Sequence, residues 1–231
     1  MPDITITGPD GDFGAYLALP ASTPAPGLLV IQEIFGVNKV MRDICDGLAA
    51  QGYTACCPDL FWRIEPGIQI TDQSEAEWQQ AFGLFQAFDV DKGVEDLITT
   101  LARLRGHEAC SGKVGSVGYC LGGKLAYLLG ARSDADCNVS YYGVGLDELL
   151  DEAPRISRPI LLHVAAKDQF VPPEAQQKIQ SGLAGPSQVT LHVYEEQDHA
   201  FAREGGAHYD AAAAQLANAR TSDFFKEHLN R

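Results

Sequence analysis

The chain has 231 residues, of which 45 % are hydrophobic and 21 % charged, and its formal net charge is −14. Its basic residues never cluster into a run. Nucleic acids and anionic membranes are therefore poor partners, because both attract proteins through positive surfaces. This length suits one α/β domain with a sizeable core, so we expect residues 1–231 to form a single domain that needs no disulfides.

The start of the chain, Met1 to Ile6, lacks the basic and apolar stretches of a signal peptide. No window approaches the ~18 consecutive apolar residues of a membrane span. The six cysteines are therefore expected to be thiols in a reducing cytoplasm. We also expect the protein to be a monomer.

Strand-like apolar runs alternate with helical patterns along the chain, around an irregular Pro- and Gly-rich segment at 59–74. The expected elements are, in chain order, an antiparallel strand pair at 4–6 and 13–19, a strand at 28–31, a helix at 40–50, a strand at 53–57, helices at 75–88 and 90–104, a strand at 114–119, a helix at 122–131, strands at 139–142 and 160–164, a helix at 173–183, a strand at 189–194 and a helix at 208–229. This alternation predicts an α/β fold with a mostly parallel central sheet and helices on both faces.

Ligands of such sheets bind outside the carboxyl ends of the strands. The candidate functional residues are therefore those that directly follow the expected strands. They are Glu33, Asp59, Cys120, Gly143, Asp168 and His199. This set contains a thiol, an imidazole and several carboxyl groups.

Cys120 lies in Gly118-Tyr119-Cys120-Leu121-Gly122, between an expected strand and an expected helix. This is the G-x-S-x-G pattern of a strained nucleophile turn, with sulfur in place of oxygen. Gly118, Gly122 and Gly123 allow strand and helix to approach, and a helix N-terminus favours the thiolate. We expect Cys120 to be the nucleophile. The other cysteines are read as buried thiols.

A base must activate this thiol, because a free cysteine with a pKa of about 8.5 is mostly protonated at neutral pH. In the order typical of this turn, an acid follows the nucleophile and a histidine comes last. Asp168 and His199 lie after later strands in that order, so they are the expected acid and base. Asp198 is an alternative acid, but it is adjacent to His199, and neighbouring loop residues rarely point the same way. Of the other histidines, His163 and His192 fall within strands, His208 and His228 on the last helix and His107 in a loop.

The chain resembles the dienelactone hydrolase (carboxymethylenebutenolidase) family, which has the α/β-hydrolase fold. The matching segments run from near residue 30 to near residue 225. They are Gln32-Glu33-Ile34-Phe35-Gly36-Val37-Asn38, Cys57-Pro58-Asp59-Leu60, Val117-Gly118-Tyr119-Cys120-Leu121-Gly122-Gly123, Tyr141-Tyr142-Gly143-Val144-Gly145, Asp168-Gln169-Phe170-Val171-Pro172 and His199-Ala200-Phe201-Ala202-Arg203.

The resemblance assigns the nucleophile, acid and base to Cys120, Asp168 and His199. It places the oxyanion-binding N–H groups on Leu121 and Ile34, which agrees with the general rule for this turn. It also implies that Glu33 holds the proton of the resting thiol. A structural alternative pairs the Glu33 carboxylate with a backbone N–H or with Arg42, because an unpaired buried carboxylate is costly.

The family's substrates resemble a small unsaturated lactone with a free carboxylate, which two arginines usually hold. One of these arginines matches Arg203, but the other position is Trp78, so one cation is missing. The resemblance also places Phe35 and Tyr142 at the substrate. Trp78 suits a neutral or aromatic acyl group, or it packs under the irregular segment. Arg42 and Arg63 are alternative cations.

The resemblance thus implies a hydrolase that opens a dienelactone-type ring through a Cys-His-Asp triad and a thioacyl intermediate, giving a maleylacetate-like acid. We expect neither a metal nor an organic cofactor, since no zinc-ligand spacing or phosphate loop occurs in the sequence. One alternative is a general carboxylesterase for small uncharged esters, which Trp78 favours. The other is a thiol redox or ligand-binding protein without turnover, because reactive thiols oxidise readily.

Overall fold

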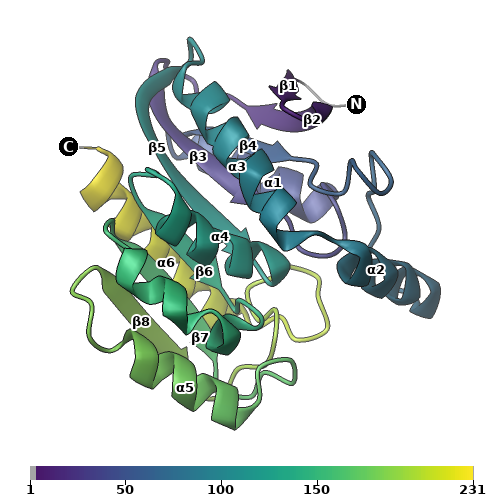
Figure 1. Cartoon of the computed structure of the whole chain (residues 1–231), viewed down its shortest axis with the longest axis vertical. Helices are drawn as coiled ribbons and strands as arrows, with labels where there is room; N and C mark the ends of the chain where they lie inside the picture. The colour runs from purple at the N-terminus through teal and green to yellow at the C-terminus, as the bar shows by residue number, and fades with distance from the viewer. Residues whose placement is uncertain (1–3, 231) are drawn as a thin grey trace. The chain divides into compact units, whose positions relative to one another are not determined.

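The computed structural model describes residues 4–230 and contains two compact units, Met1–Ser116 and Val117–Arg231 (Figure 1). The boundary between them falls within strand β5 (Cys110–Tyr119). Whether the chain is a single domain stays a prediction. In the described part, no helix is long and apolar enough to cross a membrane.

The strands of the first unit follow the order β1-β2-β4-β3-β5. Their bounds are β1 (Ile4–Gly8), β2 (Gly11–Ala18), β3 (Ala25–Ile31) and β4 (Thr54–Pro58). The expected antiparallel pair at the start of the chain is confirmed, with Ile6 opposite Phe13. β2 also pairs antiparallel with β4, whereas β3 and β4 are parallel. All five residues of β4 are buried, as their apolar character predicts.

Three helices belong to the first unit, namely α1 (Lys39–Ala50), α2 (Glu75–Ala87) and α3 (Val90–Arg105). Each begins after a side chain that accepts a hydrogen bond from a backbone N–H of the first turn, and these caps are Asn38, Ser74 and Asp89. α3 buries a stripe of residues at helical spacing that includes Val94, Leu97, Leu101 and Leu104. Figure 1 shows α3 in front of the strands of this unit and α1 behind them.

In the second unit, β5 is followed in the sheet by β6 (Asn138–Tyr141), β7 (Ile160–Ala165) and β8 (Val189–Tyr194). β6, β7 and β8 are parallel, and every residue of β6 and β7 is buried. The helices are α4 (Leu121–Arg132), α5 (Pro173–Leu183) and α6 (Ala211–Leu229), with 3-10 turns at Leu146–Glu148 and Leu150–Arg155. In Figure 1, α4 and α5 lie in front of these strands and α6 lies behind them.

Most expected elements are found within a few residues of their expected ends, but the last helix begins later than expected. The Asp210 side chain accepts from the N–H of Ala213, so α6 starts at Ala211. The prediction that His208 lies on this helix is therefore wrong, and His208 belongs to the preceding loop. The 3-10 turns were not predicted, because segments this short have no detectable period.

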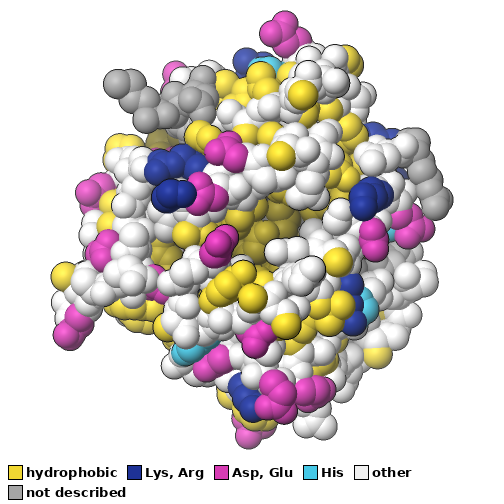
Figure 2. Space-filling view, turned by 180° about the vertical axis from the view of Figure 1, so that it is seen from behind, with side chains coloured by type: hydrophobic (Ala, Val, Ile, Leu, Met, Phe, Trp, Pro, Cys, Tyr) yellow, Lys and Arg dark blue, Asp and Glu magenta, His cyan; other side chains and the backbone are white. Residues whose placement is uncertain are grey.

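The charged surface agrees with the scattered basic residues of the sequence. On the face shown in Figure 2, Lys and Arg side chains occur singly or in small groups, interspersed with Asp and Glu side chains. This face therefore carries charges of both signs without an extended basic area.

A buried polar network connects β6, β7 and α6 in the second unit. The Thr221 hydroxyl lies 2.7 Å from the Tyr141 hydroxyl and 2.9 Å from Nε2 of His163. Nδ1 of His163 is hydrogen-bonded to the Tyr194 hydroxyl at 2.8 Å. Both ring nitrogens of His163 are thus used, as expected for a packed rather than catalytic histidine. Burial lowers the pKa of His163 well below its usual value.

We expect the free energy of unfolding to decrease as the pH falls below about 6.5, the usual histidine pKa. The folded pKa of His163 is lowered, so the unfolded chain binds the proton more readily and acid favours unfolding. This one residue should contribute up to about 1.4 kcal/mol per pH unit. Urea unfolding between pH 5 and 7 measures this dependence. The same slope in wild type and His163→Gln would contradict the prediction.

Candidate active site

Cys120 lies on a tight turn between β5 and α4. Its backbone angles are φ 57° and ψ −112°, a region that residues with side chains rarely adopt. The approach of strand and helix explains the surrounding glycines, because a Cβ at Gly118 would lie 1.9 Å from the carbonyl oxygen of Gly122. The expected nucleophile turn is present, and Cys120 stands at its tip, 8 % exposed.

The end of β6 supports this turn from the side. The N–H of Cys120 donates to the carbonyl oxygen of Tyr141 at 3.1 Å. A Cβ at Gly123 would lie 2.6 Å from the same oxygen, so only glycine fits there. Leu121 is the first residue of α4, where backbone N–H groups have no acceptor within the helix. Its N–H is therefore suited to bind an oxyanion.

His199 and Asp168 form a buried pair on the loops that follow β8 and β7. Nδ1 of His199 donates to Oδ2 of Asp168 at 2.8 Å, and the two residues are 5 % and 4 % exposed. The other oxygen, Oδ1 of Asp168, accepts from the N–H of Phe170 at 2.8 Å. The carboxylate is thus fixed by two bonds, and it leaves Nε2 of His199 as the nitrogen that can exchange a proton.

The loop that carries His199 is held by its neighbours. Oδ1 of Asp198 accepts from the N–H of His199 at 2.6 Å. Nδ1 of His208 donates to the carbonyl oxygen of His199 at 3.2 Å. Sequence reasoning gave neither Asp198 nor His208 a role at this site, because loop hydrogen bonds have no sequence period.

The electrostatics of His199 favour an ion pair with the Cys120 sulfur. Burial alone would lower its pKa, but the negative charge on the Cys120 sulfur, together with the hydrogen bonds to Asp168 and Cys120, raises it to about 10. An imidazole with this pKa is protonated at neutral pH when the neighbouring sulfur is ionised. The arrangement therefore stabilises an imidazolium next to a thiolate.

Aromatic rings enclose the imidazole. Tyr142 and Phe170 meet the His199 ring edge-on, with centroid distances of 5.1 and 4.8 Å. Tyr142 is buried, whereas Phe170 is 41 % exposed. Phe170 lies in one of the segments that resemble the family, yet no role was predicted for it. Arg203 follows on the same loop as His199 and is half-buried.

Backbone strain is concentrated around these residues. Among the described residues, the non-glycine residues with positive φ are Cys120, Tyr142 and Ala200. Ala200 directly follows His199, and the Tyr142 ring packs against the His199 ring. Strained conformations of this kind cost about 1–3 kcal/mol each and are typical of functional sites. The strain therefore marks the same place as the side-chain chemistry.

In the first unit, the loop from Gln32 to Asn38 carries three of the expected site residues. Glu33, Ile34 and Phe35 are 2 %, 6 % and 2 % exposed. The loop is held against residues 66–70, since the N–H of Ile70 donates to the carbonyl oxygen of Phe35 at 3.1 Å. A buried acidic residue thus directly precedes Ile34, the second expected oxyanion donor.

The arginines of the first unit do not supply the partners that were considered for them. Nη1 of Arg42 donates to the side-chain oxygen of Gln69 and to the carbonyl oxygen of Val37, so the structural alternative that pairs Arg42 with Glu33 is wrong. Arg63 forms ion pairs with Asp96 and Asp10. Arg63 is thereby committed to a structural network rather than to a ligand.

Trp78 lies on α2 and contacts two phenylalanines. Its ring meets Phe35 edge-on at 5.2 Å and stacks on Phe82 at 5.5 Å. Its indole N–H donates to the carbonyl oxygen of Asp72 in the irregular segment at 3.0 Å. Both interpretations of Trp78 therefore find support: it packs on the irregular segment, and it forms an apolar cluster with an expected substrate-binding residue.

The expected site residues fall into two sets. The second unit contains Cys120, Leu121, Tyr142, Asp168, His199 and Arg203, and the first unit contains Glu33, Ile34, Phe35 and Trp78. Within the second unit, Cys120, His199 and Asp168 form a connected chain of interactions. This connected set therefore brings the expected nucleophile, base and acid together.

Comparison with known proteins gives the family. Residues 13–229 match the family model described as "Dienelactone hydrolase family". The chain belongs to this family. A carboxymethylenebutenolidase of Pseudomonas putida is 45 % identical over 96 % of this chain and 94 % of its own length. A protein of Azospirillum brasilense is 56 % identical over 99 % of this chain and 100 % of its own length.

A solved structure confirms the fold of the dienelactone hydrolase family. The crystal structure of a Klebsiella pneumoniae protein covers 96 % of this chain and 95 % of its own, with 26 % identity and a TM-score of 0.84. The predicted fold class, a mostly parallel sheet with helices, is therefore confirmed. The chain is a carboxymethylenebutenolidase-like hydrolase.

Removing the Cys120 sulfur should lower the pKa of His199. Its raised pKa of about 10 depends on the charge of that sulfur more than on any other group that raises it. We expect the ring ¹⁵N signals of His199 to titrate near pH 10 in wild type and at clearly lower pH in Cys120→Ala. The signals are assigned from their loss in His199→Gln. Equal titration midpoints in wild type and Cys120→Ala would show that no ion pair forms.

Proposed function

We propose that this enzyme hydrolyses a small carboxylated lactone of the dienelactone type through a thioacyl intermediate on Cys120. The observation that carries the proposal is the connected set of Cys120, His199 and Asp168 on a strained turn and two strand-end loops. The Pseudomonas putida relative, named a carboxymethylenebutenolidase, supports the choice of substrate.

The first half of the reaction acylates the sulfur. Cys120 gives its proton to His199, and the thiolate attacks the lactone carbonyl carbon. The resulting oxyanion accepts hydrogen bonds from the N–H groups of Leu121 and Ile34. The ring C–O bond then breaks, and the His199 imidazolium protonates the departing oxygen. The raised pKa of His199 supports this order, because it favours the ion pair before substrate attack.

The second half releases the acid. Water gives a proton to His199 as it attacks the thioester carbonyl carbon, and the C–S bond breaks to restore the thiolate. Asp168 keeps the imidazole oriented and stabilises its positive charge throughout. No step requires a metal or an organic cofactor. The product is a ring-opened, maleylacetate-like dicarboxylic acid.

Glu33 is proposed to hold the proton of the resting thiol until substrate binds. Its near-complete burial, directly before Ile34 in the sequence, supports a role inside the site rather than at the protein surface. Arg42 makes its hydrogen bonds elsewhere, which leaves the carboxyl group without that guanidinium as a structural partner. The role itself follows the family resemblance.

The substrate carboxylate is assigned to Arg203, which lies four residues after the base and is half-buried. Phe35, Trp78 and Tyr142 are proposed to contact the apolar part of the substrate. The Phe35–Trp78 contact favours a second candidate function, hydrolysis of small uncharged esters, because Trp78 replaces the second arginine of the family with an apolar ring.

The proposal includes a monomeric enzyme in a reducing cytoplasm. Its six cysteines are all thiols in the structure, and thiols persist in reducing compartments. Light scattering after size-exclusion chromatography measures the molar mass, and 24.9 kDa is the value of one chain.

Loss of the nucleophile should abolish hydrolysis. We expect Cys120→Ala to lower kcat/KM for a carboxylated dienelactone by about a thousandfold or more, because the residues of a triad act as a unit. A thioacyl adduct should accumulate in wild type during rapid quenching, and mass spectrometry should locate it on Cys120. Turnover that survives in Cys120→Ala would contradict covalent catalysis. Rapid peroxide reaction without any hydrolysis would favour the redox alternative.

Loss of Arg203 should separate charged from neutral substrates. We expect Arg203→Gln to lower kcat/KM for the carboxylated lactone by about tenfold to a hundredfold, the value of one charge-assisted hydrogen bond. Hydrolysis of the neutral 4-nitrophenyl acetate should change little. The matched control is Arg155→Gln, which removes a 66 %-exposed arginine side chain from the same unit. Wild-type preference for the neutral ester would instead favour the esterase.

A further inference from the structure

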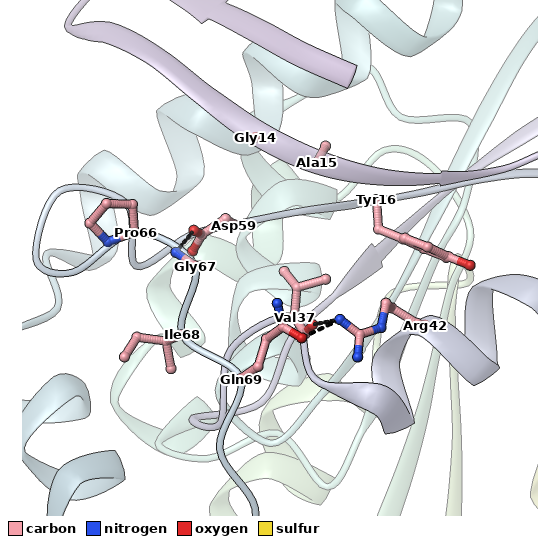
Figure 3. Close-up of a pocket in the computed structure, with 10 residues that line it drawn as sticks. All are labelled: Gly14, Ala15, Tyr16, Val37, Arg42, Asp59, Pro66, Gly67, Ile68 and Gln69. Atoms are coloured by element: carbon pink, nitrogen blue, oxygen red, sulfur yellow. Dashed lines mark hydrogen bonds between the residues drawn. The ribbon is translucent and has the colours of Figure 1, made fainter. Parts of the chain in front are cut away.

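The first unit contains a cavity that the proposed reaction does not use. It has a volume of about 270 Å³ and opens between β2, the start of α1 and the irregular segment (Figure 3). Its lining residues include Ala15, Val37, Arg42, Asp59 and Ile68. None of the residues assigned above to catalysis or to the lactone lines this cavity.

Arg42 is a cation with neutral partners on the wall of this cavity. Its Nη1 donates to the carbonyl oxygen of Val37 at 3.3 Å and to the side-chain oxygen of Gln69. Asp46, one helical turn further along α1, instead accepts a hydrogen bond from the Tyr16 hydroxyl at 2.7 Å. Within residues 4–230, Arg42 therefore has no carboxylate partner.

The two hydrogen bonds of Arg42 leave further N–H donors of its side chain for a ligand. A guanidinium has five N–H donors in a planar fork that matches a carboxylate. Both hydrogen bonds of Arg42 use Nη1, so Nη2 and Nε make none within the described part of the chain. The bonds to Gln69 and Val37 hold the guanidinium in place at the cavity, as Figure 3 shows. A held cation loses less conformational freedom when an anion binds.

The cavity between these polar groups is mainly apolar. Val37, Ile68, Pro66 and Ala15 contribute hydrocarbon surface, and Ile68 and Ala15 are 6 % and 2 % exposed. An apolar cavity of about 150 Å³ is large enough for benzene. The present cavity therefore accommodates a single ring with a substituent, but it is smaller than the ~300–1,000 Å³ typical of sites for drug-sized ligands.

The opposite wall of the cavity is acidic. In Figure 3, Asp59 and Arg42 lie on opposite sides of Val37. The two oxygens of Asp59 accept hydrogen bonds from the N–H groups of Gly67 at 2.7 Å and Phe61 at 3.0 Å. A carboxylate that reached this wall would meet a like charge, which disfavours a second acidic group on the ligand.

We propose that this cavity binds a small monocarboxylic acid with a flat apolar body, whose carboxylate is held by Arg42. The apolar body lies between Val37 and Ile68. Asp59 on the opposite wall disfavours a dicarboxylic acid. The cavity thus gives the enzyme a second ligand site, of different selectivity from the lactone site.

Calorimetric titration of the wild-type enzyme with benzoate tests the proposal. Benzoate should bind at one site, and benzamide and terephthalate should bind at least tenfold more weakly. Arg42→Gln should weaken benzoate binding by about tenfold or more, as expected for one charge-assisted hydrogen bond. The matched control is Arg103→Gln, an exposed arginine of α3 in the same unit, which should leave the affinity unchanged.

Two further variants separate this site from the proposed catalytic site. Val37→Phe fills the cavity without changing any charge, and it should abolish benzoate binding. Arg203→Gln removes the arginine assigned to the lactone, and it should leave benzoate binding unchanged. Benzoate affinity that falls in Arg203→Gln but not in Arg42→Gln, equal binding of benzamide, or absence of benzoate binding would each overturn the proposal. These measurements detect binding alone, so they do not depend on lactone hydrolysis.

Discussion

The site depends on one steric constraint, the close approach of β5 and α4 at Cys120. A side chain at Gly118 would collide with the carbonyl group of Gly122, so the turn can close only with glycine there. The closure places Cys120 in its rare backbone conformation at the start of α4. The position of Cys120 at the tip of the turn and at a helix N-terminus follows from that closure.

The strained turn needs a rigid surround, because strain persists only where neighbouring structure over-determines it. β6 supplies part of this support through the bond from the Cys120 N–H to the Tyr141 carbonyl oxygen. The Tyr141 side chain is in turn anchored by Thr221, whose hydroxyl also binds His163. The C-terminal helix is therefore connected to Cys120 through two hydrogen bonds and the buried ring of Tyr141. This explains why so polar a network lies in the core of the second unit.

The sequence predicted the parts of this site that depend on local pattern. The apolar runs identified the strands, and the residues after them included Cys120, Asp168 and His199, because parallel strands end at one edge of a sheet. The geometry of the loops could not be predicted from the sequence in the same way. The late start of α6 depends on the cap at Asp210, and the resulting loop position of His208 was predicted wrongly. A stretch of Ala-rich sequence does not by itself determine which polar residue begins a helix.

The cavity beside Arg42 could not be predicted from the sequence alone either. Nothing in the sequence distinguishes Arg42 from Arg63, and both were considered as cations for the substrate. They differ in partners that are distant in the chain. Arg63 forms ion pairs with Asp96 and Asp10. Arg42 donates to the Gln69 side chain and to the carbonyl oxygen of Val37. Ligand recognition by an arginine depends on which charges are already satisfied, and that is a property of the folded chain.

Sulfur rather than oxygen at position 120 determines the resting charge state of the site. A thiol has a pKa of about 8.5, close enough to that of an imidazole for a proton to pass between them in the ground state. The raised pKa of His199, about 10, would favour such a transfer, since a negative charge on the Cys120 sulfur is the foremost cause that raises it. A serine hydroxyl would stay protonated and leave the imidazole neutral until attack. In the proposed mechanism, Glu33 holds the thiol proton until substrate binds, and the charge pair of Cys120 and His199 forms only then, which protects the sulfur from unproductive reaction.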